Sequence, residues 1–347
     1  MKVGIIGAGG ISAHHARAFN SLGIEITAVA DINRDAFSAR RELYGNAKYY
    51  SSAEELLSDP SVDIADVCVG TRWHFDIIRQ SAAAGKHIFC EKTMTDGEAN
   101  SRQLMELLAN YPKNFQIGYM KRFFPATNKA VELLPVIGEI VSSYIISYQG
   151  FERTNDLYNN ENWKPKDGKP SRTRNYACGG MMNMAGSHML DLMNLLLGEV
   201  ASIYSLNWSP PDYDAETNSH ALFRMQHGNI VHFEAATSPY SRDGLWRDGW
   251  DERIRINGKR GNLRIFFTAW DKPQHNAPIL QLYSETEKLH SEFTFPKIDA
   301  FHEQMAYFIK NCRAGTKSRP GIKEGYYVDR IIAACYASAE SGKVICF

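Results

Sequence analysis

The first 118 residues alternate short apolar runs with segments of helical spacing. The apolar runs predict β-strands at residues 2–6, 24–30, 64–69, 86–90 and 114–119. The segments between them predict helices at residues 11–22, 35–43, 53–57, 74–84 and 97–109. Strands that alternate with helices need crossover connections, so this part is expected to form a parallel sheet covered on both faces. The fold class indicated is α/β, with a doubly wound N-terminal sheet.

The pattern changes after Tyr119. A helix over residues 128–134 and a strand over 140–148 precede a polar, Asn- and Pro-rich stretch at 152–175, and a further helix begins after Gly179-Gly180. Strand-like runs then follow closely, at residues 219–225, 229–236, 253–257, 263–267 and 279–283, before helices at 302–313 and 326–338. Short turns between several runs favour a mainly antiparallel sheet. We therefore expect an α/β domain over residues 1–121 and an α+β domain with a large open sheet over 122–347.

Length and composition indicate the number of domains and the kind of partner. The chain has 347 residues, 44% hydrophobic and 22% charged, with Lys+Arg and Asp+Glu balanced at 39 each. This length exceeds one ordinary hydrophobic core, which supports two domains. Balanced charge creates no overall field that would attract nucleic acid or an anionic membrane. We expect a small-molecule partner, and neither nucleic acid nor a membrane.

The N-terminus and the cysteines indicate a cytoplasmic protein. The first apolar run is short and breaks into glycines, unlike a signal peptide, and no apolar stretch reaches the ~20 residues of a membrane helix. The six cysteines show no CxxC spacing and no paired framework, so we interpret them as reduced thiols in a reducing compartment. The eleven histidines do not cluster with them at ligand spacing, so no metal is expected.

A glycine-rich turn directly follows the first predicted strand. Residues 7–12, Gly-Ala-Gly-Gly-Ile-Ser, fit the pattern G-x-G-x-x-G/A with Ser12 at the third small position. Gly7 permits the tight turn, Gly9 lets the backbone approach a pyrophosphate, and Ser12 keeps the helix close to the sheet. The N–H groups that open the helix would bind the pyrophosphate. This pattern predicts a dinucleotide-binding Rossmann domain, with cofactor contacts at Gly7, Gly9, Gly10, Ile11 and Ser12.

Asp31 indicates which dinucleotide binds. It ends the second predicted strand, near the ~20-residue distance at which a carboxylate binds the adenosine ribose hydroxyls. A carboxylate there would repel the 2′-phosphate of NADP. Arg34 would favour NADP if it pairs with that phosphate. It could equally lie solvated on the next helix. NAD is therefore the expected cofactor, and NADP is the less favoured alternative.

Four further segments carry a more specific pattern. They read AGKH and EKT within residues 84–93, IGYMKRF at 117–123, GG followed by His188 and Asp191 within 179–191, and WDERIRING at 250–258. In this order they resemble the Gfo/Idh/MocA family of sugar and polyol oxidoreductases, named for glucose–fructose oxidoreductase and inositol dehydrogenase. The resemblance covers nearly the whole chain.

The resemblance implies a Rossmann domain followed by an open-faced sheet domain, with the active site between them. It also implies a homodimer or homotetramer packed through that sheet. Lys92 matches the family's catalytic lysine and His188 its active-site histidine. A lysine at this position can take a proton from a hydroxyl as hydride leaves the same carbon, and the histidine can share that transfer. The activity implied is an NAD-dependent dehydrogenase of a sugar, a sugar derivative or a cyclitol.

Met184 departs from the family pattern. The family's aspartate four residues before the histidine falls at this position, and methionine can neither orient nor protonate a group. Asn183 is adjacent, but one α-helical position is a rotation of about 100°. Three interpretations compete. In the first, the chain retains Lys–His chemistry on a substrate that does not need the acid. In the second, it uses bound NAD for transient redox without net oxidation, as in a glycosidase, lyase or epimerase, and in the third it is a non-catalytic sugar- and NAD-sensing regulator. Thr93, in place of the family proline, is a second departure.

Other candidate contacts carry less specific signals. The further cofactor contacts expected are Thr71, His74 and Glu91. The expected substrate contacts are Tyr119, Arg122, Trp163, Asn183, Met184 and Asp191. Tyr119 and Arg122 could instead tie the domains together, and core packing explains an aromatic such as Trp163 equally well. The pair His14-His15 shows no partner in the sequence and is interpreted as structural.

Overall fold

The computed structural model describes residues 1–150, 161–238, 240, 242–270 and 276–347. Residues 152–160 of the predicted polar stretch lie outside this range. The chain forms two compact units: unit 1 comprises residues 1–120 with 301–330, and unit 2 comprises residues 121–300 with 331–347. This division differs from a single cut near residue 121, because residues 301–330 pack with the first unit. Phe308, for example, meets Phe89 edge to face, with ring centres 5.4 Å apart.

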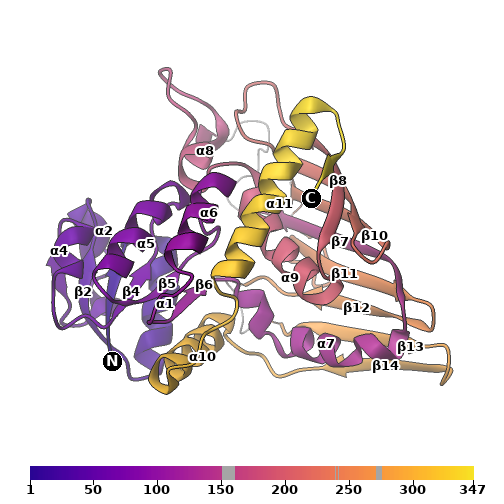
Figure 1. Cartoon of the computed structure of the whole chain (residues 1–347), viewed down its shortest axis with the longest axis horizontal. Helices are drawn as coiled ribbons and strands as arrows, with labels where there is room; N and C mark the ends of the chain where they lie inside the picture. The colour runs from indigo at the N-terminus through magenta and orange to yellow at the C-terminus, as the bar shows by residue number, and fades with distance from the viewer. Residues whose placement is uncertain (151–160, 239, 241, 271–275) are drawn as a thin grey trace. The chain divides into compact units, whose positions relative to one another are not determined.

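Unit 1 is built on a six-stranded parallel sheet in the order β3-β2-β1-β4-β5-β6 (Figure 1). Its strands are β1 (Lys2–Ile6), β2 (Glu25–Ala30), β3 (Lys48–Tyr50), β4 (Ile64–Val67), β5 (His87–Cys90) and β6 (Phe115–Ile117). The strand order reverses at β1, so β2 and β4 flank it on opposite sides. This reversal creates the switch point at which open α/β sheets bind ligands, outside the carboxyl ends of the strands. The predicted doubly wound sheet is confirmed.

The elements of unit 1 follow the predicted alternation, but one helix and one strand differ from the expectation. The helices are α1 (Gly10–Ser21), α2 (Arg34–Ser38), α3 (Arg41–Tyr44), α4 (Ala53–Leu57), the 3₁₀ turn η1 (Thr71–Trp73), α5 (His74–Ala83), α6 (Glu98–Leu107) and most of α10 (Ala300–Ala314). The single helix expected over residues 35–43 is broken at Arg40, whose φ of −123° and ψ of 15° are not helical. The edge strand β3 was not predicted, because three residues are too few to show a period.

Unit 2 contains a nine-stranded sheet in the order β14-β13-β12-β11-β7-β10-β9-β8-β15. Its strands are β7 (Ile140–Gly150), β8 (Val200–Trp208), β9 (Asn218–Met225), β10 (Ile230–Ser238), β11 (Trp250–Gly258), β12 (Gly261–Phe267), β13 (Ile279–Ser284), β14 (Leu289–Thr294) and β15 (Ile345–Cys346). In the part of the chain that the structure describes, β7 and β10 pair in parallel and the other neighbours are antiparallel. The expectation of a mainly antiparallel sheet is confirmed.

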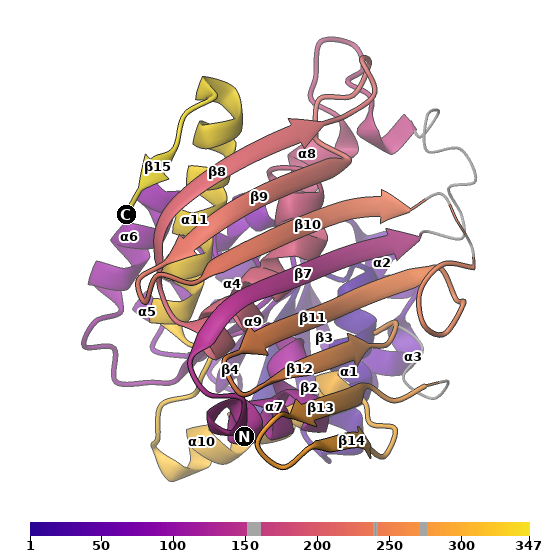
Figure 2. The same cartoon turned by 90° about the vertical axis from the view of Figure 1, so that its right-hand side faces the viewer.

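The two faces of this sheet differ in exposure. Along β9, Ala221 and Phe223 are buried, whereas His220 and Leu222, which alternate with them, are exposed. In Figure 2, β8, β9, β10, β7 and β11 lie in front and α9 lies behind them. The helical elements of this unit are η2 (Met120–Phe123), α7 (Pro125–Ile137), η3 (Glu161–Trp163), α8 (Arg172–Ala177), a π-helical turn (Met182–Gly186), α9 (Ser187–Leu197) and the second part of α11 (Ile322–Ser341).

Among the residues that the structure describes, no helix combines the length and the apolar composition that crossing a bilayer requires.

Asp329, on the part of α11 that belongs to unit 1, is a buried carboxyl group. Its Oδ2 accepts hydrogen bonds from the backbone N–H of Thr95, at 2.8 Å, and from the Ser101 hydroxyl, at 2.5 Å. Burial is the largest influence and raises the pKa of Asp329 to about 7, against these hydrogen bonds. The side chain therefore joins α11 to the segment that follows Lys92.

Asp329→Asn is expected to change how stability depends on pH. A carboxyl group whose folded pKa of about 7 exceeds its unfolded value of about 4 binds its proton more tightly in the folded state. Its contribution to stability is thus fully present below about pH 4 and is lost as pH rises through about 7. Asparagine has no proton to lose, so the urea midpoint of the variant relative to wild type should rise between pH 5 and pH 8.

The control for this measurement is Asp76→Asn, on the exposed face of α5. Its midpoint relative to wild type should be the same at both pH values. If the urea midpoint of Asp329→Asn relative to wild type is also the same at pH 5 and pH 8, the raised pKa of Asp329 is contradicted.

Candidate functional site

The glycine turn between β1 and α1 is closed on one side and open on the other. Gly7 has φ of +101°, and a Cβ there would lie 2.8 Å from the carbonyl carbon and oxygen of Cys68, so only glycine fits. At Gly9, a Cβ would meet no protein atom within 4 Å. Ser12 is buried, and its hydroxyl lies 2.7 Å from both the Gly9 carbonyl and the Tyr44 hydroxyl. Backbone at the open side of this turn is therefore accessible to a phosphate group.

Asp31 lies at the same turn, because β2 ends beside β1. Its Oδ2 accepts from the Ala8 N–H at 2.6 Å, and its Oδ1 accepts from the Asn33 N–H at 2.7 Å. The Arg34 guanidinium lies 5.5 Å from the centre of the Tyr49 ring, and the Tyr49 hydroxyl donates to the Asp31 carbonyl at 2.8 Å. The Asp31 carboxylate is the group that is hydrogen bonded to the glycine turn.

Lys92 follows β5 directly, at the carboxyl edge of the same sheet. It is partly exposed, and the peptide bond between Lys92 and Thr93 is cis. His74, at the start of α5, is buried with Nδ1 2.7 Å from the Thr93 carbonyl oxygen and Nε2 3.0 Å from that of Val69. Burial lowers the pKa of His74 against the effect of these two bonds. His74 therefore ties the end of β4 to the turn that holds Lys92.

Glu91 meets a residue that the sequence analysis missed. His15 of α1 is buried, with Nε2 3.1 Å from Glu91 Oε1 and Nδ1 2.9 Å from Asp66 Oδ1. Cys68 Sγ also lies 3.2 Å from His15 Nδ1. The spacing of histidines and cysteines along the chain gave no sign of this contact, because tertiary packing joins positions 53 residues apart. One signal was available: His15 shares the buried face of α1 with Ser12, Ala16 and Phe19, where a polar ring needs a partner.

His15, Asp66 and Cys68 also form the kind of cluster that could hold a metal. One ligand atom from each lies within 4.8 Å of the others, and all three side chains are buried. The same atoms, however, hydrogen bond to one another. The cluster is therefore satisfied as a hydrogen-bonded group.

In unit 2, Gly180 is required by a close approach to Glu216. A Cβ at Gly180 would lie 2.0 Å from the Glu216 carbonyl oxygen. The Glu216 carboxylate accepts from the N–H groups of Gly180 and Met182, at 3.0 and 2.9 Å, and from the Tyr336 hydroxyl at 2.9 Å. Burial is the largest influence on Glu216 and raises its pKa. Glu216, which the sequence analysis did not single out, thus holds the start of the helical segment that carries His188.

That segment begins as a π-helical turn and not as a regular α-helix. The π turn covers Met182–Gly186, and His188 is the second residue of α9. A π turn closes between residues five apart, so the rotation per residue is smaller than the ~100° of an α-helix, yet Asn183 and Met184 still point in different directions, as expected. Asn183 is buried and donates from Nδ2 to the Ala177 carbonyl at 3.0 Å, whereas Met184 is partly exposed. His188 is buried.

Arg122 and Asp191, two expected substrate contacts, bind each other. Arg122 Nε and Nη2 donate to the two Asp191 oxygens, both at 2.7 Å. Asp191 is buried, and such a bidentate pair has a fixed geometry. Because Asp191 lies on α9 three residues after His188, this pair anchors the histidine's helix to η2.

The remaining expected contacts are buried. Trp163 stacks on Tyr213, with ring centres 6.1 Å apart, and Tyr119 is fully buried. Next to Arg122, Lys121 forms a buried ion pair with Glu252, which also accepts from Trp250 Nε1 at 2.6 Å.

Among the expected cofactor contacts, the structure gathers Gly7, Gly9, Gly10, Ile11, Ser12 and Asp31 at one turn. Thr71, His74 and Glu91 lie after β4 and β5, and their roles as cofactor contacts stay predictions.

Gly9→Ala should weaken dinucleotide binding without disturbing the fold. The added methyl group meets no protein atom, but it would occupy the side of the turn that a pyrophosphate must approach. We expect the dissociation constant for NADH, measured by fluorescence titration, to rise at least about tenfold while the urea midpoint is unchanged. Gly97→Ala, whose methyl group also meets no atom within 4 Å, is the matched control. Equal NADH affinity in Gly9→Ala and wild type would contradict the phosphate site.

Known proteins resemble this chain in both units. Residues 1–119 match the family model GFO_IDH_MocA, described as an oxidoreductase family with an NAD-binding Rossmann fold. Residues 132–347 match the model of its C-terminal alpha/beta domain. Among solved structures, levoglucosan dehydrogenase in complex with NADH and levoglucosan shares the fold, with a TM-score of 0.84 and 18% identity over 100% of this chain and 98% of that one.

Two curated relatives match along most of their length. Myo-inositol 2-dehydrogenase of Thermotoga maritima is 32% identical, over 91% of this chain and 89% of its own. Inositol 2-dehydrogenase of Paracoccus denitrificans is 23% identical, over 99% of this chain and 95% of its own. With both family models matched, this chain belongs to the Gfo/Idh/MocA family of oxidoreductases, and its first 119 residues are the family's NAD-binding Rossmann domain.

Proposed function

We propose that this chain is an NAD-dependent dehydrogenase that transfers a hydride between nicotinamide and a carbinol carbon of a sugar, a sugar derivative or a cyclitol. One observation carries the proposal: the glycine turn, Asp31 and Lys92 all lie at the carboxyl edge of one parallel sheet. A dinucleotide whose phosphates bind at the turn extends along this edge. The relatives named for inositol and levoglucosan support a polyhydroxylated substrate.

Lys92 and His188 are the proposed acid–base groups. NAD bound at the glycine turn would supply the hydride acceptor. Lys92, in its neutral form, takes the proton of the reacting hydroxyl, and its ammonium form returns it in the reverse direction. His188 donates a hydrogen bond to the reacting oxygen and shares that proton transfer. The Arg122–Asp191 pair and Glu216 position the histidine's helix and take no proton themselves.

Met184 favours a reaction that needs no third acid. Its thioether cannot protonate the substrate, and the neighbouring Asn183 amide donates to the Ala177 carbonyl. We therefore propose that the Lys–His pair suffices. The same substitution also motivates a second candidate, transient oxidation by bound NAD in a glycosidase, lyase or epimerase. That reaction would give no net NADH and would place solvent deuterium on a substrate carbon. A sensing regulator would bind the dinucleotide and turn over no sugar.

We also propose a reducing, cytoplasmic compartment. The support is that none of the six cysteines, all of which lie in the described residues, forms a disulfide, and that Cys68, Cys90, Cys312 and Cys335 are buried.

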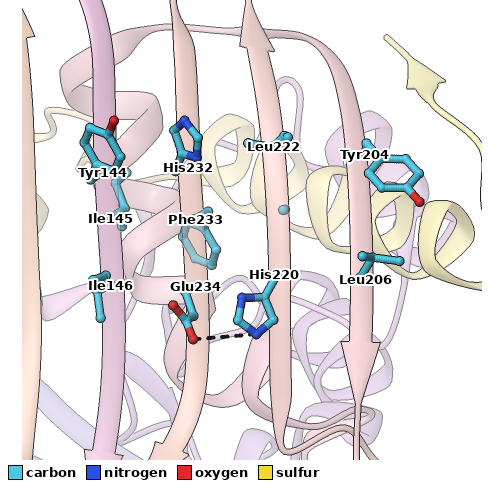
Figure 3. Close-up of a pocket in the computed structure, with 11 residues that line it drawn as sticks. Tyr144, Ile145, Ile146, Tyr204, Leu206, His220, Leu222, His232, Phe233 and Glu234 are labelled. Carbon is cyan, nitrogen blue, oxygen red and sulfur yellow. Dashed lines mark ion pairs between the residues drawn. The ribbon is translucent and has the colours of Figure 1, made fainter.

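The exposed face of the unit 2 sheet supports self-association. Figure 3 shows a hollow on this face between β7, β10, β9 and β8, lined by Tyr144, Leu206, His220, Leu222, His232 and Glu234. Tyr144 stacks on His232 with ring centres 4.8 Å apart, and His220 lies 3.6 Å from Glu234. Leu206 and Leu222 are 54% and 45% exposed. An apolar face with a polar rim is typical of a protein interface, so we propose a homodimer or homotetramer through this sheet.

Lys92→Ala should reduce turnover at least about a hundredfold, the low end of an acid–base contribution, while the NADH dissociation constant stays within about threefold. Lys92→Arg should be equally inactive, because a guanidinium keeps the charge but releases no proton near neutral pH. The measurement is NADH absorbance with a panel of sugars and polyols, in parallel with NAD and NADP. The control is Lys129→Ala, an exposed lysine paired with Glu132 on α7. Unchanged turnover in Lys92→Ala would exclude this lysine as the proton-transfer group.

Leu222→Asp should separate the subunits, because a carboxylate at the centre of a dry interface loses its hydration. Sedimentation velocity at micromolar concentration should give a dimer or tetramer for wild type and a monomer for the variant. Leu107→Asp, at a leucine of similar exposure on α6 of unit 1, is the matched control and should keep the wild-type mass. A monomeric wild type, or a variant of wild-type mass, would refute this interface.

A further inference from the structure

His15 forms the centre of a buried charged cluster next to the Lys92 turn. Its ring lies between Asp66 of β4 and Glu91, the residue that follows β5. Nδ1 is 2.9 and 3.1 Å from the two Asp66 oxygens, and Nε2 is 3.1 Å from Glu91 Oε1. The rings of Phe89 and Phe301 flank it, with centres at 5.4 and 5.7 Å. The chemistry proposed above does not use this histidine.

The two carboxylates determine the protonation of the ring. A neutral imidazole has one N–H, so one of its nitrogens would turn a lone pair toward a carboxylate about 3 Å away. An imidazolium donates to both. Burial alone lowers the pKa of His15, but the charge of Asp66 and the hydrogen bonds to Asp66 and Cys68 outweigh it and raise that pKa well above its ordinary value. Burial also raises the pKa of the Cys68 thiol, which therefore stays neutral.

Glu91 connects this cation to Lys92. While Oε1 accepts from His15, Oε2 accepts from the backbone N–H of Lys92 at 3.3 Å. The Glu91 backbone N–H donates to the Val67 carbonyl at 3.0 Å, so the residue is held at its main chain as well. Burial would raise the pKa of Glu91, but the His15 hydrogen bond and charge, with Lys92, lower it. Glu91 is thus a buried carboxylate with one orientation.

We propose that His15 is a positioning residue for Lys92: as a buried imidazolium, it holds the Glu91 carboxylate in place and offsets its negative charge. This inference rests on the proposed function of Lys92 as the proton acceptor. An uncompensated carboxylate beside Lys92 would stabilise the ammonium form, which cannot accept a proton. The His15 cation opposes that effect and so favours the neutral amine. The charged or titratable groups that face it are Asp66, Cys68 and Glu91.

The first test measures the charge state of His15 and does not depend on enzymatic turnover. In a ¹⁵N-histidine NMR titration of the full chain, one ring should still show two protonated nitrogens at pH 7, and this signal should be absent from His15→Gln. A second variant, Asp66→Asn, keeps the shape and an acceptor oxygen but removes one carboxylate charge, so the ring should lose its proton at lower pH. A His15 ring with one unprotonated nitrogen at pH 7 overturns the proposal.

The second test reads the effect on the reaction. In sugar oxidation with NAD, the rise of kcat/KM with pH should move to higher pH by about one unit in His15→Gln, with NADH affinity within about threefold of wild type. A purely structural role would lower activity at all pH values without moving the profile. His14→Gln, the same substitution one residue earlier on α1, is the control and should leave the profile in place. If the pH profile of kcat/KM in His15→Gln is the same as in wild type, the proposal is overturned. If the wild type shows no turnover, the proposed function is contradicted, and the NMR titration alone decides the charge of His15.

Discussion

The close approach of the glycine turn to the end of β4 is the contact on which the arrangement of unit 1 depends. Gly7 presses its backbone against Cys68, which leaves no room for a side chain. This contact brings the start of α1 over the carboxyl ends of β1 and β4, so His15 comes within reach of Asp66 and of Glu91 after β5. Asp31 reaches the same turn from the end of β2. Both the phosphate-binding backbone and the turn that carries Lys92 therefore derive their positions from one sheet edge.

Buried charges then hold the elements that present the candidate residues. His15 lies between two carboxylates in unit 1, while unit 2 contains the Lys121–Glu252 and Arg122–Asp191 pairs. Burying an unpaired charge costs several kcal/mol, so separating any of these pairs inside the protein is unfavourable. Such pairs define orientation more than they add stability. Arg122–Asp191 anchors the helix of His188 in this way, as Glu216 does through backbone N–H groups.

Local patterns were sufficient for much of the fold. The period of the apolar runs predicted the parallel and the antiparallel sheet, and the spacing from Gly7 to Asp31 predicted a turn and a carboxylate that do meet. The same reasoning failed where the signal was short or irregular. β3 has three residues, too few for a period, and the π turn before His188 was expected to be part of a regular helix.

By itself, the amino-acid sequence determined most of the elements, the phosphate-binding turn, the family and the candidate roles of Lys92 and His188. Each of these depends on residues that are neighbours along the chain or on a recognisable order of motifs. Only the tertiary structure decided which side chains pair. Arg122 with Asp191 and His15 with Asp66 and Glu91 join positions dozens of residues apart, and a hydrogen bond depends on distance in space, which linear spacing does not encode. For the same reason, His15 had no visible partner in the sequence but meets Asp66, Cys68 and Glu91 in the folded chain.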